Sequence, residues 1–216
     1  ERDFYFFKGA HDTILPSETS LPADTFLFHF GSLTQISVSA NRTTEKLVAD
    51  ARKQGAIVSY DPNIREALWG ELHRARLVIL DTAKKVDMLK VNEEEARLLA
   101  NTEDIRDAAN KLYSSNLDII VVTRGKLGCY YKTAKYEGDI PTINVKVVDT
   151  TGAGDAFNAG FIYGLYKEKR KASQLTKEEL ETVLKRAVVI GSLTITKKGA
   201  VSAFPTKKDI DKFSKK

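Results

Sequence analysis

The stretch VVDTTGAGDAFNAGFIYG, residues 147–164, joins a β-branched run to a segment with helical spacing. Gly152 and Gly154 allow successive backbone N–H groups to turn inward at this join. A helix that begins near Gly154 adds the positive end of its dipole. The segment therefore predicts a concave anion-binding turn between a strand and a helix.

This turn differs from two familiar phosphate motifs. No Gly-Lys-Ser/Thr follows the glycines, and Phe157 occupies the third glycine position of the dinucleotide fingerprint. Asp155 lies in the first helical turn, where the dipole favours a negative charge and the carboxylate could accept a proton from a hydroxyl. The alternative is a glycine-rich turn in which Asp155 only stabilises the start of the helix.

Around this stretch, strand-like runs alternate with helical patterns, which is typical of βαβ units and a parallel sheet. We expect strands at residues 26–31, 56–60, 88–91, 118–123 and 143–148, with a hairpin partner at 129–133. We expect helices at 43–54, 71–85, 93–100, 104–115, from about 154, at 177–194 and at 206–213. Because ligands of open α/β sheets bind outside the carboxyl ends of the strands, the polar clusters there predict one shared site. These clusters are 61–65, 92–95, 123–128 and 149–155.

Length and composition suit one main α/β domain, since the 216 residues are 42% hydrophobic. Acidic and basic residues are interspersed along the chain, and the net charge is +5. Nucleic-acid binding is not favoured, because no basic surface with interleaved aromatics is recognisable. A single cysteine, Cys129, fits a reducing cytosol. No apolar stretch is long enough to span a bilayer. Because the numbering begins at Glu1 within a strand-like RDFYFF run, we expect it to start inside a longer protein.

DTTGAGDAFNAG resembles the carboxy-terminal signature of the ribokinase-type, phosphofructokinase-B-like sugar kinases. FHFGS, DPNIREALW and KVNEEEARLL are similar to fructokinases in particular. The resemblance implies a ribokinase-like three-layer α/β/α fold with a mostly parallel central sheet. It also implies ATP-dependent phosphorylation of a sugar hydroxyl, with fructose to fructose 6-phosphate as the first expectation. Because the family's amino-terminal part and lid largely precede this chain, residues 1–216 are expected to be the carboxy-terminal two-thirds of a single kinase domain.

The same resemblance implies roles for the residues at the strand ends. Asp155 would be the base, with the backbone of Gly152, Ala153 and Gly154 holding the charge that develops on the phosphoryl group. On the nucleotide side, the expected residues are Asn92, Glu95, Thr123, Gly125 and Gly128, with Glu95 reaching Mg²⁺ through water. By spacing alone, however, Asn92 and Glu95 are a helix capping box, and Thr123 to Gly128 is a plain hairpin connection.

On the acceptor side, the resemblance implies Asn63 and Arg65, together with Asp155. Arg2 is a further expected sugar contact, although a lone arginine is usually a solvated charge. Asp149 and the carbonyl of Thr151 match the stretch that holds K⁺ in related kinases. The expected ligands are therefore a sugar, ATP, Mg²⁺ and, at that stretch, K⁺. We expect a cytoplasmic location and neither a nucleic-acid nor a membrane partner. Assembly into a homodimer stays open.

Two other readings stay open. One is a kinase for 2-keto-3-deoxygluconate, another ketose or a nucleoside. The other is a kinase-fold protein that binds ligands without turnover. Asp155 and the glycines before it are intact, which favours an active enzyme.

Overall fold

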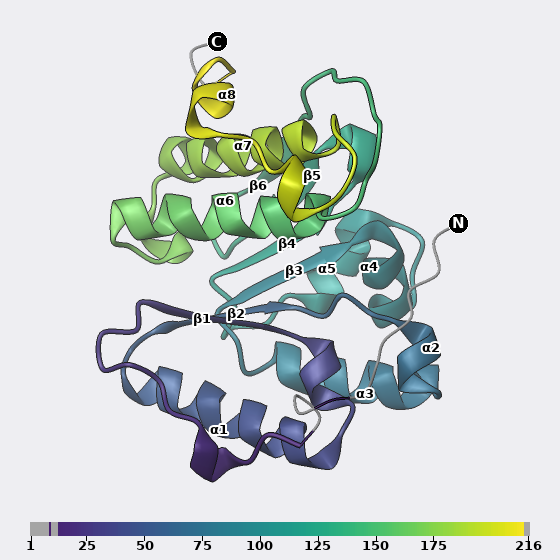
Figure 1. Cartoon of the computed structure of the whole chain (residues 1–216), viewed down its shortest axis with the longest axis vertical. Coiled ribbons are helices and arrows are strands. Elements are labelled where there is room, and N and C mark those ends of the chain that lie inside the picture. Colours follow the sequence, from purple (N-terminus) through teal and green to yellow (C-terminus); the bar gives the residue numbers. More distant parts are fainter. Residues whose placement is uncertain (1–8, 10–12, 214–216) are drawn as a thin grey trace. The chain divides into compact units, whose positions relative to one another are not determined.

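The computed structural model describes Gly9 and residues 13–213. These residues form two compact units, with the boundary in the sequence between Lys90 and Val91. Figure 1 labels the helices and strands of both units. Arg2 and the RDFYFF run lie outside the described residues, so the expectations for them remain predictions.

The first unit alternates strands with helices, as predicted. Its elements are η2 (Pro16–Glu18), β1 (Leu27–Gly31), η3 (Ser32–Gln35), α1 (Val38–Lys53), β2 (Ile57–Asp61), α2 (Glu66–Trp69), α3 (Leu72–Ala83) and β3 (Met88–Asn92), which runs across the sequence boundary. β1 and β2 are parallel, and so are β2 and β3. All five residues of β2 are buried, as expected for a strand between two parallel neighbours.

Local chemistry explains two features of this unit. The Ser37 side chain accepts a hydrogen bond from the N–H of Ala40 at 3.2 Å, so α1 begins at Val38, earlier than the expected residue 43. Trp69 is 3% exposed and donates its indole N–H to the hydroxyl of Ser32 at 3.3 Å. The tryptophan therefore packs in the core.

The carboxyl end of β2 carries a buried ion pair. Lys90 Nζ donates to Asp61 Oδ2 at 2.8 Å, with side-chain exposures of 12% and 5%. Removing one partner would leave a buried charge, which costs about 3–5 kcal/mol. The pair therefore holds the ends of β2 and β3 together, next to the turn that contains Asn63 and Arg65.

The second unit contains the remaining elements. They are α4 (Glu93–Ala100), α5 (Ile105–Leu112), β4 (Ile119–Thr123), η4 (Gly125–Leu127), β5 (Cys129–Lys132), β6 (Glu137–Ile140), α6 (Ala153–Glu168), η5 (Ala172–Gln174), α7 (Lys177–Thr194), η6 (Val201–Ala203) and α8 (Lys207–Asp211). β4 and β5 form the expected hairpin, and β6 pairs antiparallel with β5. The sequence reading missed β6, whose residues EGDI include two acids with weak strand preference.

The helices α6 and α7 lie side by side along most of their length (Figure 1). Glycines on α6 make the close approach feasible: a Cβ on Gly164 would lie 2.4 Å from Val183 Cγ1, and one on Gly160 would lie 3.0 Å from the Cα of Ala187. At the beginning of α6, a Cβ on Gly191 of α7 would lie 3.1 Å from the carbonyl oxygen of Ala153. This packing brings α7 against the first turn of α6.

The expected strand at 143–148 is wrong. The structure has no strand between Ile140 and α6, and this segment is half-buried to exposed. Its backbone is held by a helix end: the N–H groups of Val148 and Asp149 donate to the carbonyl of Ile195 at 2.8 and 3.2 Å. Instead of pairing with a strand, the segment from Thr142 to Val145, with Val147, lines a cavity.

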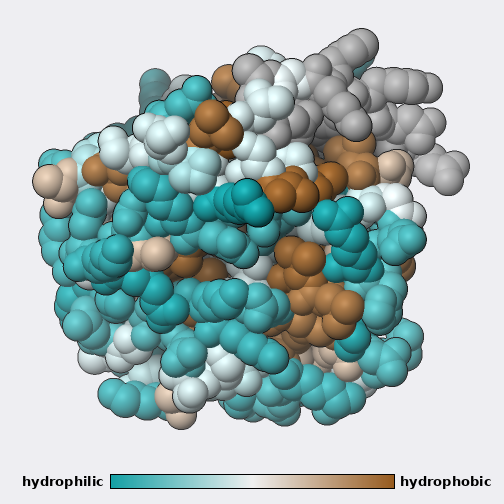
Figure 2. All heavy atoms as spheres, turned by 90° about the horizontal axis from the view of Figure 1, so that it is seen from below, coloured by the Kyte–Doolittle hydropathy of each residue, from teal (hydrophilic) through white to brown (hydrophobic). Residues whose placement is uncertain are grey.

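The face seen in Figure 2 is predominantly hydrophilic, with one larger group of hydrophobic side chains right of the centre and smaller groups elsewhere. Among the helices that the structure describes, none combines the length and hydropathy that crossing a membrane requires.

Candidate active site

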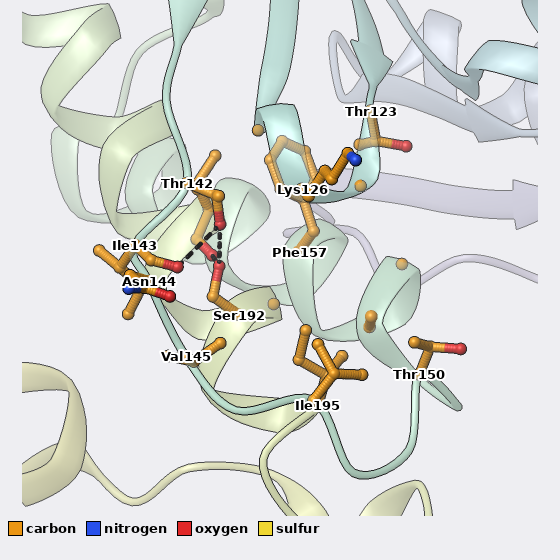
Figure 3. A pocket seen from close by; sticks show the side chains of 17 residues that line it. Thr123, Lys126, Thr142, Ile143, Asn144, Val145, Thr150, Phe157, Ser192 and Ile195 are labelled. Atoms are coloured by element: carbon orange, nitrogen blue, oxygen red, sulfur yellow. Dashed lines mark hydrogen bonds between the residues drawn. The ribbon is translucent and has the colours of Figure 1, made fainter.

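The second unit contains a cavity of about 550 Å³. Its lining comes from Thr123 and the turn after it, from Thr142 to Val145 with Val147 and Thr150, from the start of α6, and from one face of α7. Figure 3 shows Ile143, Val145 and Ser192 at one side and Thr123 and Thr150 at the other, with Phe157 between them. The first side combines apolar side chains with the hydroxyls of Thr142 and Ser192, which are hydrogen-bonded at 2.7 Å, and the second side contains the strand end and the turn.

The start of α6 opens on this cavity without a side-chain cap. Gly152 is the N-cap, with a φ of +78°, and Ala153 and Gly154 line the cavity. Side chains do cap five other helices: α1, α4, α5, α7 and α8. In the described part of the chain, no hydrogen bond uses the N–H of Gly154 or Asp155. The first turn of α6 therefore keeps donors and a positive dipole end for an anion.

Asp155 is the third residue of α6 and is exposed. Its carboxylate makes no hydrogen bond or ion pair with the residues that the structure describes. An acid that only stabilises the helix dipole would occupy the same position. What distinguishes Asp155 is its position directly after two cavity-lining residues.

The turn from Thr123 to Gly128 forms the neighbouring wall. Gly128 has a φ of +88°, and a Cβ there would lie 1.9 Å from the carbonyl oxygen of Ile140. The Arg124 N–H donates to the Gly128 carbonyl at 2.7 Å, which closes the turn. The Thr123 hydroxyl donates to the carbonyl of Val91 at 3.3 Å, so the strand end is tied to β3.

Arg124 anchors this turn through charge. Its guanidinium donates to Asp139 Oδ1 at 2.8 Å and to Glu93 Oε1 at 3.4 Å. Arg106 takes the other oxygen of Asp139 at 2.8 Å, and Arg97 lies 3.7 Å from Glu93. The charges alternate in sign from α4 through the turn to β6 and α5, and together they hold the turn in place.

Cys129 directly follows the turn and is buried. Burial, with the negative charge of Asp139 adding to it, raises the pKa of this thiol to about 12. The thiol is therefore protonated at neutral pH and supplies no thiolate beside the cavity.

Asn92 and Glu95 form the capping box that their spacing predicts. The Glu95 N–H donates to Asn92 Oδ1 at 2.8 Å, and the Asn92 N–H donates to Glu95 Oε2 at 2.9 Å. Glu95 is 5% exposed. The structural interpretation of this pair is thus confirmed, and it fixes the glutamate at the first turn of α4.

Asp149 lies in the loop before α6. Its Oδ1 accepts from the N–H of Thr151 at 2.9 Å and from the Thr151 hydroxyl at 2.7 Å, while Oδ2 accepts from the N–H of Gly199 at 2.9 Å. Among the described residues, no group of three or more His, Cys, Asp or Glu is arranged to hold a metal ion.

A sequence profile of the pfkB family carbohydrate kinases matches residues 1–207. The chain belongs to the pfkB family. It is 36% identical over 211 residues to the "Probable fructokinase-2" of Arabidopsis thaliana, covering 95% of this chain and 64% of the relative. The chain thus spans slightly less than two thirds of that pfkB protein.

Solved pfkB-type structures show the same fold. A fructokinase from Vibrio cholerae O395, in fructose, ADP and calcium ion bound form, has a TM-score of 0.84 at 27% identity and covers 94% of this chain and 65% of that chain. A double mutant of it, in fructose, ADP and potassium ion bound form, has a TM-score of 0.84 at 26% identity over 94% and 64%. Aminoimidazole riboside kinase from Salmonella enterica, complexed with aminoimidazole riboside and an ATP analog, has a TM-score of 0.82 at 28% identity over 94% and 67%. The predicted ribokinase-like α/β fold class is confirmed.

Within this pfkB chain, five of the predicted site residues line the cavity described above. They are Thr123, Gly125, Gly128, Ala153 and Gly154. Asn92, Glu95, Asp149, Thr151, Gly152 and Asp155 belong to the same unit but are not among the residues that line it. Asn63 and Arg65 belong to the first unit, where Asn63 has a φ of +47° and the Arg65 guanidinium donates to the carbonyl of Ile64 at 3.1 Å.

The sequence reading missed most of the apolar wall. Val188 of α7 and Ile195, the residue after its end, line the cavity with the polar Ser192 between them, but their spacing equals that of any core-facing helical stripe. Ile143, Val145 and Val147 alternate like a strand, which is how they were interpreted. Lys126 also lines the cavity and was not predicted. Its sequence position could have indicated it, because it is a cation between two turn glycines.

Proposed function

We propose that this protein transfers the γ-phosphoryl group of ATP to a sugar hydroxyl, with fructose to fructose 6-phosphate as its reaction. Membership of the pfkB family supports the reaction class. The fructokinase names of the Arabidopsis and Vibrio relatives support the acceptor. Since the chain spans 64% of the Arabidopsis relative, both statements remain proposals for the whole protein.

One observation carries the proposal: the uncapped start of α6 opens on the cavity, with Asp155 in the same helical turn. Free N–H groups and a helix dipole suit charge that develops on a transferring phosphoryl group. In the proposed step, Asp155 accepts the proton of the sugar hydroxyl, and the hydroxyl oxygen forms a bond to the γ-phosphorus. The bond from that phosphorus to its bridging oxygen breaks, and ADP leaves.

The nucleotide would occupy the cavity, with Thr123, Gly125 and Gly128 on its phosphate side. Glu95 would help to organise the water shell of the Mg²⁺ ion that accompanies ATP, and Asn92 would lie near the phosphates. The capping box suits an outer role for Glu95, because Mg²⁺ keeps several waters and takes few direct carboxylates. When bound, Mg²⁺ neutralises phosphate charge.

On the acceptor side, we propose that Asn63 and Arg65 bind the sugar, and Arg2 remains a predicted contact outside the described residues. A planar guanidinium suits a hydroxyl pair, a carboxylate or a phosphate. We also propose K⁺ at Asp149 and the Thr151 carbonyl, supported by the potassium form of the Vibrio variant. The expected cytoplasmic location and homodimer stay predictions.

A second acceptor class is favoured by one comparison. The Salmonella relative acts on a riboside and matches this fold as well as the fructokinases do. A nucleoside kinase is therefore the alternative to test, together with the 2-keto-3-deoxygluconate kinase and a protein that binds without turnover.

The experiment compares specificity constants of the full chain for fructose, ribose, adenosine and 2-keto-3-deoxygluconate with MgATP. The proposal expects the highest kcat/KM with fructose. A clear preference for the keto acid would reassign the acceptor and give Arg65 a carboxylate to bind. If none of the four acceptors is phosphorylated, the proposed kinase activity is contradicted.

A further inference from the structure

We propose that Lys126 is a phosphate-binding residue of the nucleotide site. The assignment rests on the proposed function, because it takes ATP as the donor. Lys126 belongs to η4, between Gly125 and Gly128, and lines the cavity. In Figure 3 its ammonium nitrogen lies toward Thr123.

The charge of the cavity lining singles out this residue. Among the described residues that line the cavity, Lys126 alone is charged, and the wall contains no carboxylate. The other side of the cavity presents Ile143 and Val145 together with the uncharged polar side chains of Thr142, Asn144 and Ser192. A ligand that matches both sides has an uncharged heteroaromatic ring at one end and negative charge at the other, as a nucleoside polyphosphate does.

Neighbouring charges do not neutralise Lys126. Arg124, two residues earlier, is paired with Glu93 and Asp139. No ion pair or hydrogen bond joins the ammonium group of Lys126 to any side chain that the structure describes. The turn therefore separates two roles: Arg124 anchors it, and Lys126 keeps its charge for a ligand.

The backbone around Lys126 is fixed while its side chain is exposed. The hydrogen bond from the Arg124 N–H to Gly128 and a second one, from the Leu127 N–H to the Arg124 carbonyl at 2.9 Å, hold the turn. An ammonium group offers three donors on a flexible stem, which suits phosphate oxygens of varying position. The first turn of α6, with its free N–H groups, lines the same cavity. Phosphates between these two features would meet positive charge from both.

The test measures binding of ADP and of adenosine to the full chain by titration calorimetry. For Lys126→Met we expect ADP affinity to fall about tenfold, which is about 1.4 kcal/mol and the scale of one charge-assisted hydrogen bond. Adenosine affinity should stay within twofold of the wild type, because adenosine has no phosphate. Lys126→Arg should restore most of the ADP affinity.

Lys135→Met is the matched control, since Lys135 is an exposed lysine in the connection between β5 and β6 and is not among the residues that line this cavity. It should leave both affinities unchanged. An equal loss for ADP and adenosine in Lys126→Met would indicate a structural role and overturn the assignment, and so would no loss at all. The proposed function is judged separately by sugar phosphorylation: ADP binding that depends on Lys126, without turnover of any sugar, would sink the kinase proposal and leave this one standing.

Discussion

The carboxylate of Asp149 accepts a hydrogen bond from the backbone N–H of Gly199 at 2.9 Å, across 50 residues of sequence. Its other oxygen accepts hydrogen bonds from the N–H and the hydroxyl of Thr151. The loop before α6 is thereby tied to the segment after α7. Gly199 suits this position because its φ is +96° and a Cβ would lie 2.6 Å from Ser202 Oγ.

Monovalent cations should affect the rate if Asp149 and the Thr151 carbonyl hold K⁺. We expect higher initial rates in potassium chloride than in the chloride of a bulky organic cation at equal ionic strength. Asp149→Asn should remove that difference. It should also destabilise the fold by about 1–3 kcal/mol, because one amide N–H would meet a backbone donor. Equal wild-type rates in the two salts would withdraw Asp149 and Thr151 from the ion site.

Asp155→Asn should bind ATP normally and lose at least about 10²-fold in kcat, because the amide cannot accept the sugar's proton. Glu178→Gln is a suitable control, since Glu178 is an exposed acid in the first turn of α7. Loss of a helix-terminal charge alone costs about 0.3–1 kcal/mol of stability. If Asp155→Asn melts earlier yet keeps near-normal kcat, Asp155 is only a helix stabiliser.

Gly128→Ala should destabilise the protein more than Gly125→Ala. Both glycines have positive φ, but a Cβ at 128 would collide with the Ile140 carbonyl, whereas one at 125 has nothing within 4 Å. We expect a loss of about 1 kcal/mol at 125, from backbone strain, and more than about 2 kcal/mol at 128. Urea unfolding measures both; similar values would mean that the β6 end moves aside easily.

If the cavity holds ATP as proposed, Arg124→Met should raise the KM for ATP about threefold with little change in kcat, because the turn that lines the cavity loses both of its ionic anchors. The stability change should be small, since partly exposed ion pairs contribute about 0.2–1 kcal/mol each. Arg97→Met provides the comparison, because Arg97 also approaches Glu93 but lies on α4. An equal rise in KM for Arg97→Met would argue against a specific role of the turn anchor.

Acid should weaken the protein partly through Glu179. The guanidinium of Arg170 at 2.7 Å, with the N–H of Thr176, lowers the pKa of this carboxyl from 4.5 to about 2. A lowered folded-state pKa means that the ionised group stabilises the fold fully above pH 4.5 and loses its effect as pH falls toward 2. The stability difference between wild type and Glu179→Gln should therefore shrink over that range. A difference that is constant with pH would contradict the pairing.

Local sequence was sufficient for the elements whose signals lie within one helical turn. The Asn92–Glu95 capping box and the boundaries of α4 and α7 agree with the predicted ones, because caps act over three or four residues. The glycines of DTTGAGD predicted a turn and a helix that begins near Gly154, and α6 begins at Ala153. That Gly152 rather than Thr150 or Thr151 is the N-cap was decided by the structure. Local sequence also predicted the acid in that turn, the glycine turn after β4 and the alternation of strands and helices.

Tertiary packing decided the rest of the site. Residues 143–148 have strand-like alternation, yet the structure assigns them to no strand. Several of them line the cavity, and the N–H groups of Val148 and Asp149 donate to the carbonyl of Ile195, just after α7. Val188 and Ile195 face the cavity because glycines on both helices, Gly160 and Gly164 of α6 and Gly191 of α7, let α6 and α7 pack closely. The contacts of Asp149 with Gly199 and of Arg124 with Asp139 join positions 50 and 15 residues apart. Such pairs depend on where whole elements pack, and side-chain periodicity records only which face of each element is apolar.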